Sequence, residues 1–390
     1  MIEIKRASVK LKKDIKNLYQ KVYGSYYSLP EIQDDDLMEE ILNDEDNVWV
    51  VAQEDGNIVG SLIFRVNKEI SVCKAMGAVV NPSHRGRGLF SQMFEFGLQL
   101  IDTEIIYALT RTISPEPQKL LLKHNFVSLG IFPNVRRVYA YENHGLYAYI
   151  KPSAFQKRKK INELTYEVAA LQEILKQIII NQDFRNGALE HWKEFVYEKI
   201  KIIPRQKFNI EPKEAKKIET KIINVEKDYI NEYDSLRFKF FPFHKPNFKI
   251  ITEYGSFYLH LNMIDKHCAI MGIDVPLDDI ERLYNLFFNI PYIVDKLDAR
   301  YLEIVSMASK HVNHSIILDN GFIPAAYFPC LIPLKENKNK FRVDAVIFFY
   351  PYNLPHFKKL FIPDDFKEYV RYVYSMIVEK INREIQSSLQ

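Results

Sequence analysis

Cysteine is scarce in this sequence, with three residues among 390. Cys73, Cys268 and Cys330 lie far apart, which excludes a disulfide framework and a zinc-binding ladder. No apolar run approaches the roughly 18 residues of a membrane-spanning helix. Residues 1–5 also lack the charged-then-apolar pattern of a secretory signal. We therefore expect a soluble, cytoplasmic protein with no membrane partner.

A strong charge of one sign is also missing. Lys and Arg number 53 and Asp and Glu number 50, so the net charge is only +3. This balance does not favour a nucleic-acid partner. The basic run 157–160 is expected to be the solvated first turn of a helix. His311 and His314 have helical spacing but no evident third ligand, so we predict no metal site.

What the sequence does contain is apolar and aromatic material, at 47% and 13% of residues. That content excludes global disorder, and 390 residues favour two domains. In the first 80 residues the hydrophobic spacing predicts, in order, a strand, a helix, an aromatic and acidic loop over 23–36, and three strands. The expected elements are 2–5, 9–22, 48–51, 58–66 and 70–80.

The most informative segment is Asn-Pro-Ser-His-Arg-Gly-Arg-Gly-Leu-Phe-Ser at residues 81–91. Pro82 ends the preceding strand, and apolar spacing from Leu89 onward predicts a helix. A strand, a glycine loop and a helix start form an anion cradle, because free amides and the helix dipole point at the ligand. The segment is neither a Rossmann fingerprint nor a Walker loop.

This segment resembles motif A of the GNAT acyltransferases, Arg/Gln-x-x-Gly-x-Gly/Ala after a strand and a proline. Arg85 and Gly88 match, whereas Phe90 replaces the final small residue. The following pattern agrees with the resemblance through residue 150, with Asn125-Phe126 where the family usually has Gly-Phe. Expected there are a strand, a short helix and three further strands at 105–110, 116–124, 127–132, 135–141 and 146–150.

The resemblance implies acetyl-CoA as co-substrate and no metal. Its diphosphate would lie on the loop and its pantetheine arm beside the preceding strand, where a bulge would aim one amide at the thioester carbonyl. The implied coenzyme-binding residues are Ala78, Val79, Val80, Arg85, Gly86, Arg87, Gly88, Leu89, Phe90 and Ser91.

The resemblance also exposes a departure from the family. Many members carry a tyrosine acid five residues before the Phe of Gly-Phe, and that position here is Leu121. The acid is missing, unnecessary or another tyrosine, with Tyr107 and Tyr141 as candidates and Glu69 as a candidate base. Cys73 is expected to be a buried hydrophobe.

An internal repeat extends the resemblance to the rest of the chain. Asn125-Phe126 matches Gly321-Phe322, and the segment 131–133 matches 327–329, both at an offset of 196 residues. We expect an α+β protein with two GNAT-like domains, each a mixed, mostly antiparallel twisted sheet flanked by helices. The predicted boundaries are 1–150, a helical linker over 151–215, and 216–390. The second copy has carboxylates in place of the cradle, so it is expected to be degenerate.

The acceptor is expected to be a small-molecule or peptide amine, bound by aromatic residues of the two copies. The candidates are Tyr26, Tyr27, Phe241 and Phe243. Three functions stay open: an acyl-CoA-dependent N-acyltransferase, a non-catalytic acyl-CoA-binding or scaffold protein, and a tRNA-dependent aminoacyl transferase. The sequence does not indicate the oligomeric state.

Overall fold

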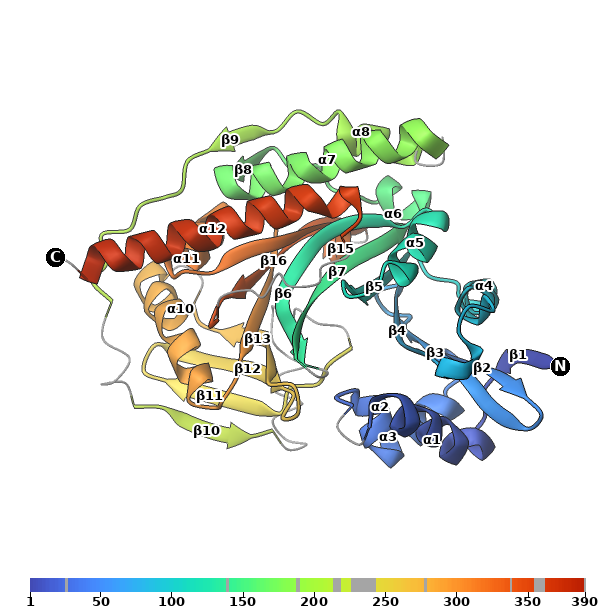
Figure 1. The fold of residues 1–390 in the computed structure, drawn as a ribbon. Coiled ribbons are helices and arrows are strands. Elements are labelled where there is room, and N and C mark those ends of the chain that lie inside the picture. Colours follow the sequence, from blue (N-terminus) through green and yellow to red (C-terminus); the bar gives the residue numbers. More distant parts are fainter. Residues whose placement is uncertain are drawn as a thin grey trace.

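The computed structural model describes residues 1–24, 27–137, 140–186, 190–212, 219–225, 243–276, 279–336, 339–353 and 362–388. Its main feature is one strongly curved sheet of fourteen strands, in the order β1-β2-β3-β4-β5-β7-β6-β15-β16-β14-β13-β12-β11-β10 (Figure 1). Seven strands come from residues before 151 and seven from residues after 220.

The strands of the first half run from the outer edge of the sheet to its centre. They are β1 (Ile2–Arg6), β2 (Val48–Glu54), β3 (Asn57–Asn67), β4 (Val72–Val80), β5 (Ile105–Arg111), β7 (Tyr141–Ile150) and β6 (Val127–Arg137). Neighbours in this half are antiparallel except β4 and β5, which are parallel. The predicted division into strands 127–132 and 135–141 was wrong, since one strand, β6, covers the whole first range and continues to Arg137 in the second.

The second half has the same strand order from its own outer edge. Its strands are β10 (Lys221–Asn224), β11 (Phe248–Thr252), β12 (Gly255–Leu261), β13 (His267–Asp274), β14 (Tyr301–Met307), β16 (Asn339–Tyr350) and β15 (Ile323–Glu336). Here β13 and β14 form the parallel pair. The halves join where Gly130 of β6 pairs with Ala326 of β15. A Cβ at position 130 would lie 2.2 Å from the Ala325 carbonyl oxygen, so this junction requires glycine.

The halves also agree in local detail. β5 begins at Ile105 and β14 at Tyr301, the same separation of 196 residues as in the sequence repeat. Before β4, Ser71 has a positive φ and its carbonyl accepts from the Glu104 amide. Before β13, Lys266 has a positive φ and its carbonyl accepts from the Arg300 amide. Both parallel pairs therefore begin with the same backbone arrangement.

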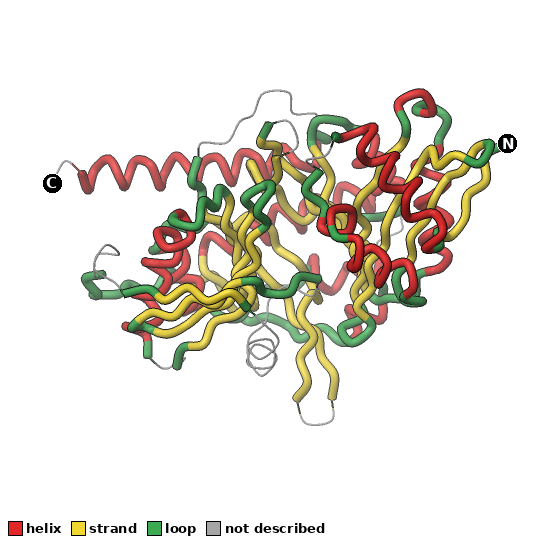
Figure 2. The backbone as a smooth tube through the Cα atoms, turned by 90° about the horizontal axis from the view of Figure 1, so that it is seen from below, coloured by secondary structure: helices red, strands yellow, loops and turns green. Residues whose placement is uncertain are grey.

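Helices cover both faces of the sheet. α1 (Lys12–Tyr23) and α3 (Asp35–Asn43) pack on one face of the first half, and α4 (Leu89–Leu100) packs on β2 and β3 from the other side. α2 (Pro30–Gln33) lies within the predicted loop 23–36, which is a correction. α7 (Tyr166–Asn186) and α12 (Asp364–Ser388) lie side by side across the β6–β15 junction (Figure 1), and Figure 2 shows α12 as the long helix that leads to the C-terminus. The other helices among the described residues are α5 (Glu116–Lys123), α6 (Pro152–Gln156), α8 (Lys193–Val196), α10 (Ile280–Asp295), α11 (His311–Asp319) and three 3-10 turns, Val9–Leu11, Pro82–His84 and Glu190–Trp192.

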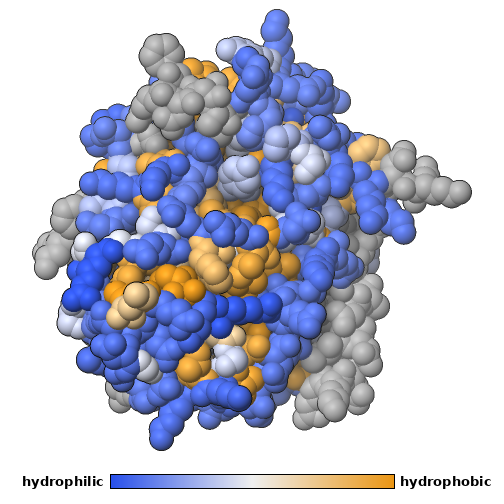
Figure 3. All heavy atoms as spheres, turned by 90° about the vertical axis from the view of Figure 1, so that its right-hand side faces the viewer, coloured by the Kyte–Doolittle hydropathy of each residue, from blue (hydrophilic) through white to orange (hydrophobic). Residues whose placement is uncertain are grey.

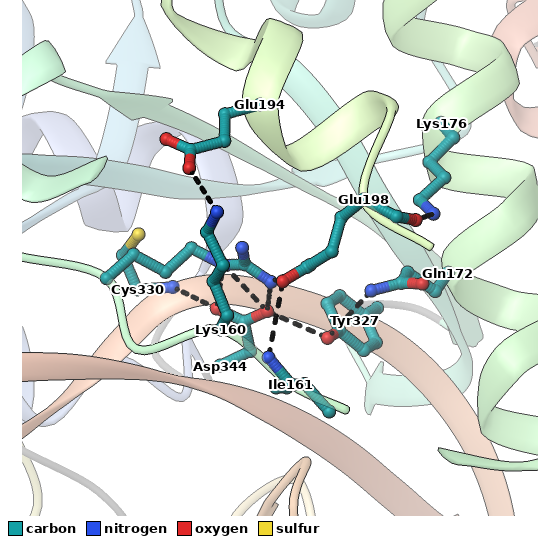
Figure 4. A network of polar contacts seen from close by, with 10 residues as sticks. Lys160, Ile161, Gln172, Lys176, Glu194, Glu198, Tyr327, Cys330 and Asp344 are labelled. Carbon is teal, nitrogen blue, oxygen red and sulfur yellow. Dashed lines mark hydrogen bonds and ion pairs between the residues drawn. The ribbon is translucent and has the colours of Figure 1, made fainter. Parts of the chain in front are cut away.

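The basic run 157–160 is not the first turn of a helix, which corrects the sequence prediction. It follows α6 and precedes β8 (Glu163–Thr165), which pairs with β9 (Lys201–Ile203). Arg158 is buried and donates to Asp344 at 2.8 and 2.6 Å and to Glu198 at 2.7 Å. Figure 4 shows Tyr327 and Cys330 converging on the same Asp344 carboxylate. The ion pair between Arg158 and Asp344 therefore holds the segment 157–160, which lies between the halves, against β16.

Two further features bear on the expectations from sequence. Among the described residues, no helix is long and apolar enough to span a membrane. His314 is buried, with Nε2 3.0 Å from the Met307 carbonyl oxygen, and burial lowers its pKa to about 3. Within the described ranges, no three His, Cys, Asp or Glu side chains gather as a metal-ligand group.

Candidate functional site

The loop between β4 and α4 has a backbone that only glycine adopts readily. Gly86 has φ +78° and Gly88 has φ +72°. Asn81 shapes the entry to this loop, because its side-chain oxygen accepts from the Ser83 amide at 3.4 Å. Gly88 is the N-cap of α4 and supplies no side-chain cap. The helix therefore starts with its first turn open.

The amides of this open turn are available to a ligand. From Gly86 to Ser91, no backbone amide donates to an acceptor within the described part of the chain. Unsatisfied amides and the positive end of the helix dipole both favour an anion at this place. The corresponding helix of the second half, α10, is closed, since the Asp279 carboxylate accepts from the Arg282 amide at 3.0 Å. Of these two helices, α4 is the one whose first turn has no side-chain cap and no capping carboxylate.

Two arginines of the loop differ in how they are held. Arg85 donates from Nε to the Val80 carbonyl at 3.4 Å and forms no ion pair with any described residue. Arg87 lies 3.3 Å from Glu54, which also contacts His84 at 2.7 Å. The hydrogen bond from His84 and the charge of Arg87 hold the pKa of the Glu54 carboxyl below its usual range. Of the two guanidinium groups, that of Arg85 has no carboxylate partner among the described residues and is therefore the more available to bind an anion.

β4 carries the bulge that was expected from sequence. Its pairing with β3 shifts between Met76–Ile63 and Val79–Ser61, and Gly77 there has φ +66°. Tyr19 donates its hydroxyl to the Gly77 carbonyl, and Tyr23 donates to the Ala78 carbonyl at 3.3 Å. Helix α1 therefore fixes the carbonyl side of the bulge.

The two parallel strands separate just before this bulge. β4 pairs with β5 from Val72 to Ala75 only, opposite Ile105 to Ala108. Beyond Ala75 neither strand has the other as a partner, so an extended group could bind between them by backbone hydrogen bonds. Ala75 and Ala108 are the last pair before the opening, and Lys74 and Tyr107 are the pair before that.

The side of the molecule that carries β1–β3 and α4 also exposes apolar surface. Figure 3 shows apolar side chains lying between hydrophilic ones on this face. Leu100 of α4 is 47% exposed, although its helix packs closely elsewhere. The close packing is visible at Gly97, where a Cβ would lie 2.1 Å from the Phe64 ring. The position of the α4 start is therefore set by a contact that excludes any side chain.

The candidate catalytic residues occupy three different places. Tyr107 is paired with Lys74 at the strand separation, and burial raises the pKa of its hydroxyl. Tyr141 begins β7, with its ring 6.0 Å from the Arg137 guanidinium. Glu69 is exposed in the turn before β4, so the whole paired part of that strand separates it from the bulge. This position argues against the expectation that Glu69 is the base.

Leu121, which occupies the position of the family's acid, and Cys73, which was expected to be a buried hydrophobic residue, both lie in the core. Leu121 is 2% exposed and Cys73 is fully buried. Burial also raises the pKa of the Cys73 thiol. Neither side chain can take part in proton transfer or nucleophilic attack at the strand opening.

The candidate acceptor-binding aromatics are described only in part. Tyr26 and Phe241 lie outside the described residues. Tyr27 stacks on Tyr23 with ring centres 4.4 Å apart. Phe243, from the second half, lies 6.2 Å from the Tyr107 ring. Tyr107 and Phe243 are therefore brought together, in agreement with an aromatic contact between halves.

Sequence reasoning missed a group of buried and half-buried charged residues. They come from both halves and include Glu31, Arg65, Lys74, Arg111, Arg136, Glu142, Asp265 and Glu303. Lys74 stands in an otherwise apolar strand segment, which is the one signal that pointed to a special position.

Part of the first half is similar to a known family. Residues 13–113, which include the loop, match the model of the Acetyltransferase (GNAT) family. No curated protein matches the chain. Among solved structures, an acetyltransferase of the GNAT family from Streptococcus pneumoniae is similar, at 15% identity and a TM-score of 0.33, over 39% of this chain and 99% of that chain.

Two other solved structures show the same extent of similarity. A GNAT family acetyltransferase from Bacillus cereus is 21% identical, with a TM-score of 0.31, over 39% of this chain and 98% of that chain. The acetyltransferase yncA from Salmonella typhimurium, solved with acetyl-CoA, is 14% identical, with a TM-score of 0.33, over 38% of this chain and 94% of that chain.

Proposed function

We propose that this protein is an acyl-CoA-dependent N-acyltransferase with acetyl-CoA as its expected donor and a small-molecule or peptide amine as its acceptor. We also propose that residues 216–390 are a degenerate copy of the GNAT-like fold of residues 1–150. The observation that carries the proposal is the uncapped start of α4, with two left-handed glycines and no competing side-chain carboxylate cap. The equal strand orders of the halves support the repeat.

The loop would hold the donor by its diphosphate. The amides from Gly86 to Ser91 are free to donate, and Arg85 adds an uncommitted charge. The bulge residues Ala78, Val79 and Val80 flank the strand opening in which the arm would lie. The donor supplies a thioester, and transfer replaces its C–S bond by a C–N bond to the amine.

The protein's part in this reaction is to position the amine and to manage its proton. Direct attack requires a neutral amine, so an acceptor must take one proton from the ammonium group. Burial raises the pKa of the Tyr107 hydroxyl, so this group stays protonated and cannot act as the base, and the same shift makes it a weaker acid. We retain Tyr107 as the first candidate acid because of its place beside the strand opening, with Tyr141 as the second choice.

The test is release of free CoA from acetyl-CoA with a panel of amines. Arg87→Glu combined with Gly88→Glu puts two carboxylates at the start of α4. This variant should show no turnover, and calorimetry should detect no coenzyme binding. Lys119→Glu, on the exposed side of α5, changes charge without touching the loop and should keep both. Unchanged turnover in the loop variant would refute the proposal.

One observation favours a second candidate function. Leu121 is buried where many GNAT enzymes have their acid, which fits a protein that binds acyl-CoA without catalysis. Coenzyme binding with no acyl transfer to any amine would select this alternative. A tRNA-dependent aminoacyl transferase would instead bind charged tRNA and be indifferent to the loop variant. A cytoplasmic location stays a prediction.

A further inference from the structure

The face of the sheet beside the strand opening is polar in both halves. In the first half Arg65, Lys74 and Tyr107 are direct cross-strand neighbours, so their side chains share one face. In the second half His260, Ala269 and Glu303 form the corresponding row on β12, β13 and β14.

These two faces meet in the interior of the molecule. Arg136 of β6 donates to Asp265, which precedes β13, at 2.7 Å. The ring of Tyr107 lies 5.9 Å from the ring of Phe328 on β15. The charges of Glu31 and Glu303, one from each half, both act on Lys74. Side chains of the two halves therefore surround one buried polar region.

Most charges in this region are neutralised in pairs. Arg65 contacts Glu31 at 2.9 Å, Arg111 contacts Glu142 at 2.6 Å, and Arg136 contacts Asp265 at 2.7 Å. Outside these three pairs lie Lys74 and Glu303, and the one partner of Glu303 among the described residues is His267.

Lys74 is the unusual member. It is 7% exposed, yet it makes no hydrogen bond and no ion pair within the described chain. Glu303 is 9% exposed and has one partner, His267, at 3.2 Å. An unpaired buried charge is costly, so natural proteins rarely keep one without a ligand or a function for it.

Several other buried nitrogen and oxygen atoms in the same region lack a hydrogen-bond partner. Arg65 Nε, Glu31 Oε2, His267 Nδ1 and the Tyr301 hydroxyl are buried without a hydrogen-bond partner. Arg65 Nε belongs to the direct neighbour of Lys74, and Tyr301 and His267 are cross-strand partners beside Glu303. Unused donors and acceptors therefore gather around both Lys74 and Glu303.

We propose that this region binds the acceptor, and that the acceptor is an amine that also carries a carboxylate, as a free amino acid does. Lys74 and Arg65 Nε bind the carboxylate, and Glu303 of the second half faces the ammonium group. The inference rests on the proposed function, because the strand opening next to Lys74 is where the thioester would lie. It gives the second half a direct part in acceptor recognition.

The experiment compares matched ligands that differ only in the carboxylate. Calorimetry on the full chain, with and without coenzyme A, would measure L-alanine against ethylamine, L-phenylalanine against 2-phenylethylamine, and L-lysine against 1,5-diaminopentane. We expect at least one pair in which the amino acid binds about tenfold or more tightly, as one charged hydrogen bond predicts. Glu303→Gln should weaken binding of both members of that pair.

Variants of Lys74 decide the assignment. Lys74→Met, close in volume, should bring the pair to within about twofold of each other, whereas Lys74→Arg should keep a preference for the amino acid. Lys119→Met is the control for a lost surface lysine and should change nothing. An undiminished preference in a folded Lys74→Met protein would overturn the proposal, as would binding of the carboxylate-free amines alone or of no member of any pair.

The failure of this inference differs from the failure of the proposed function. Acyl transfer confined to amines without a carboxylate would remove the inference and leave the transferase standing. Tight amino-acid binding that depends on Lys74, without any acyl transfer, would remove the proposed transferase function and leave the amino-acid site standing.

Discussion

The buried lysine gives a stability prediction that needs no substrate. Burial, together with the charge of Arg136, lowers the pKa of Lys74 from 10.5 to about 8. A group that loses proton affinity on folding destabilises the folded state at pH values below its folded pKa. That shift corresponds to about 3 kcal/mol, since each pKa unit is worth roughly 1.4 kcal/mol.

The sign of the pH dependence follows from proton counting. Between the folded and the unfolded pKa, the unfolded state binds more protons at Lys74, so the wild type gains stability as pH rises. Below pH ~8 the full cost is present, and above pH ~10.5 it is gone. Replacement by methionine removes the charge in both states. Lys74→Met should therefore be more stable than wild type near pH 7, with an advantage that shrinks by about 2 to 3 kcal/mol toward pH 10.

The assay is urea unfolding of wild type, Lys74→Met and Lys119→Met across this pH range, compared at equal m value. Other groups also titrate near pH 10, but they do so in all three proteins and cancel in the difference. A Lys74→Met protein that is less stable near neutral pH would mean that the lysine is paired after all. A difference independent of pH would equally refute the reasoning.

Three further substitutions test the packing around the site. Gly97→Ala should cost about 1–3 kcal/mol in unfolding free energy and weaken coenzyme binding, because its Cβ would meet the Phe64 ring at 2.1 Å. Arg342→Met should lower stability by about 1–3 kcal/mol in denaturant melts, because the Ile70 carbonyl loses a buried donor and Glu104 loses its contact at 2.7 Å, keeping Lys157 as its partner. Asp279→Ala removes the cap of α10 and should cost about 1 kcal/mol without altering coenzyme affinity in calorimetry.

The elements predicted well from sequence are those that local patterns determine. The strand, proline, glycine loop and helix over 72–100 follow from hydrophobic period and backbone preference, and the bulge at Gly77 was expected from the family resemblance. The separation of 196 residues between β5 and β14 could be read from two short identities because the repeat spacing is uniform there.

The parts that sequence reasoning missed depend on contacts between distant segments. Arg158 looked like one of four solvated basic residues, but it pairs with Asp344, 186 positions away. The predicted strands 127–132 and 135–141 left a break at Pro133, yet the strand continues through this proline to Arg137. Lys74 pairs with no described residue, and its unusual state depends on Arg136, Glu31 and Glu303 packing around it. No local pattern carries that information.

The second half differs from the first at the two places that matter for chemistry. At the helix start, Asp279 caps α10 with a carboxylate, whereas Gly88 leaves α4 open. At the strand separation, Glu303 stands at the position that Tyr107 has in the first half. The first difference puts a carboxylate at the start of α10, and the second puts a negative charge close enough to act on Lys74.

In the function proposed above, the donor loop and the acceptor region are separate places in the fold. The two proposed sites share no side chain, so substitutions in them should have independent effects. The loop variants should change coenzyme affinity alone, and Glu303→Gln should change acceptor affinity alone. A Glu303→Gln protein with weakened coenzyme binding in the absence of acceptor would show instead that the second half supports the fold of the donor site as a whole.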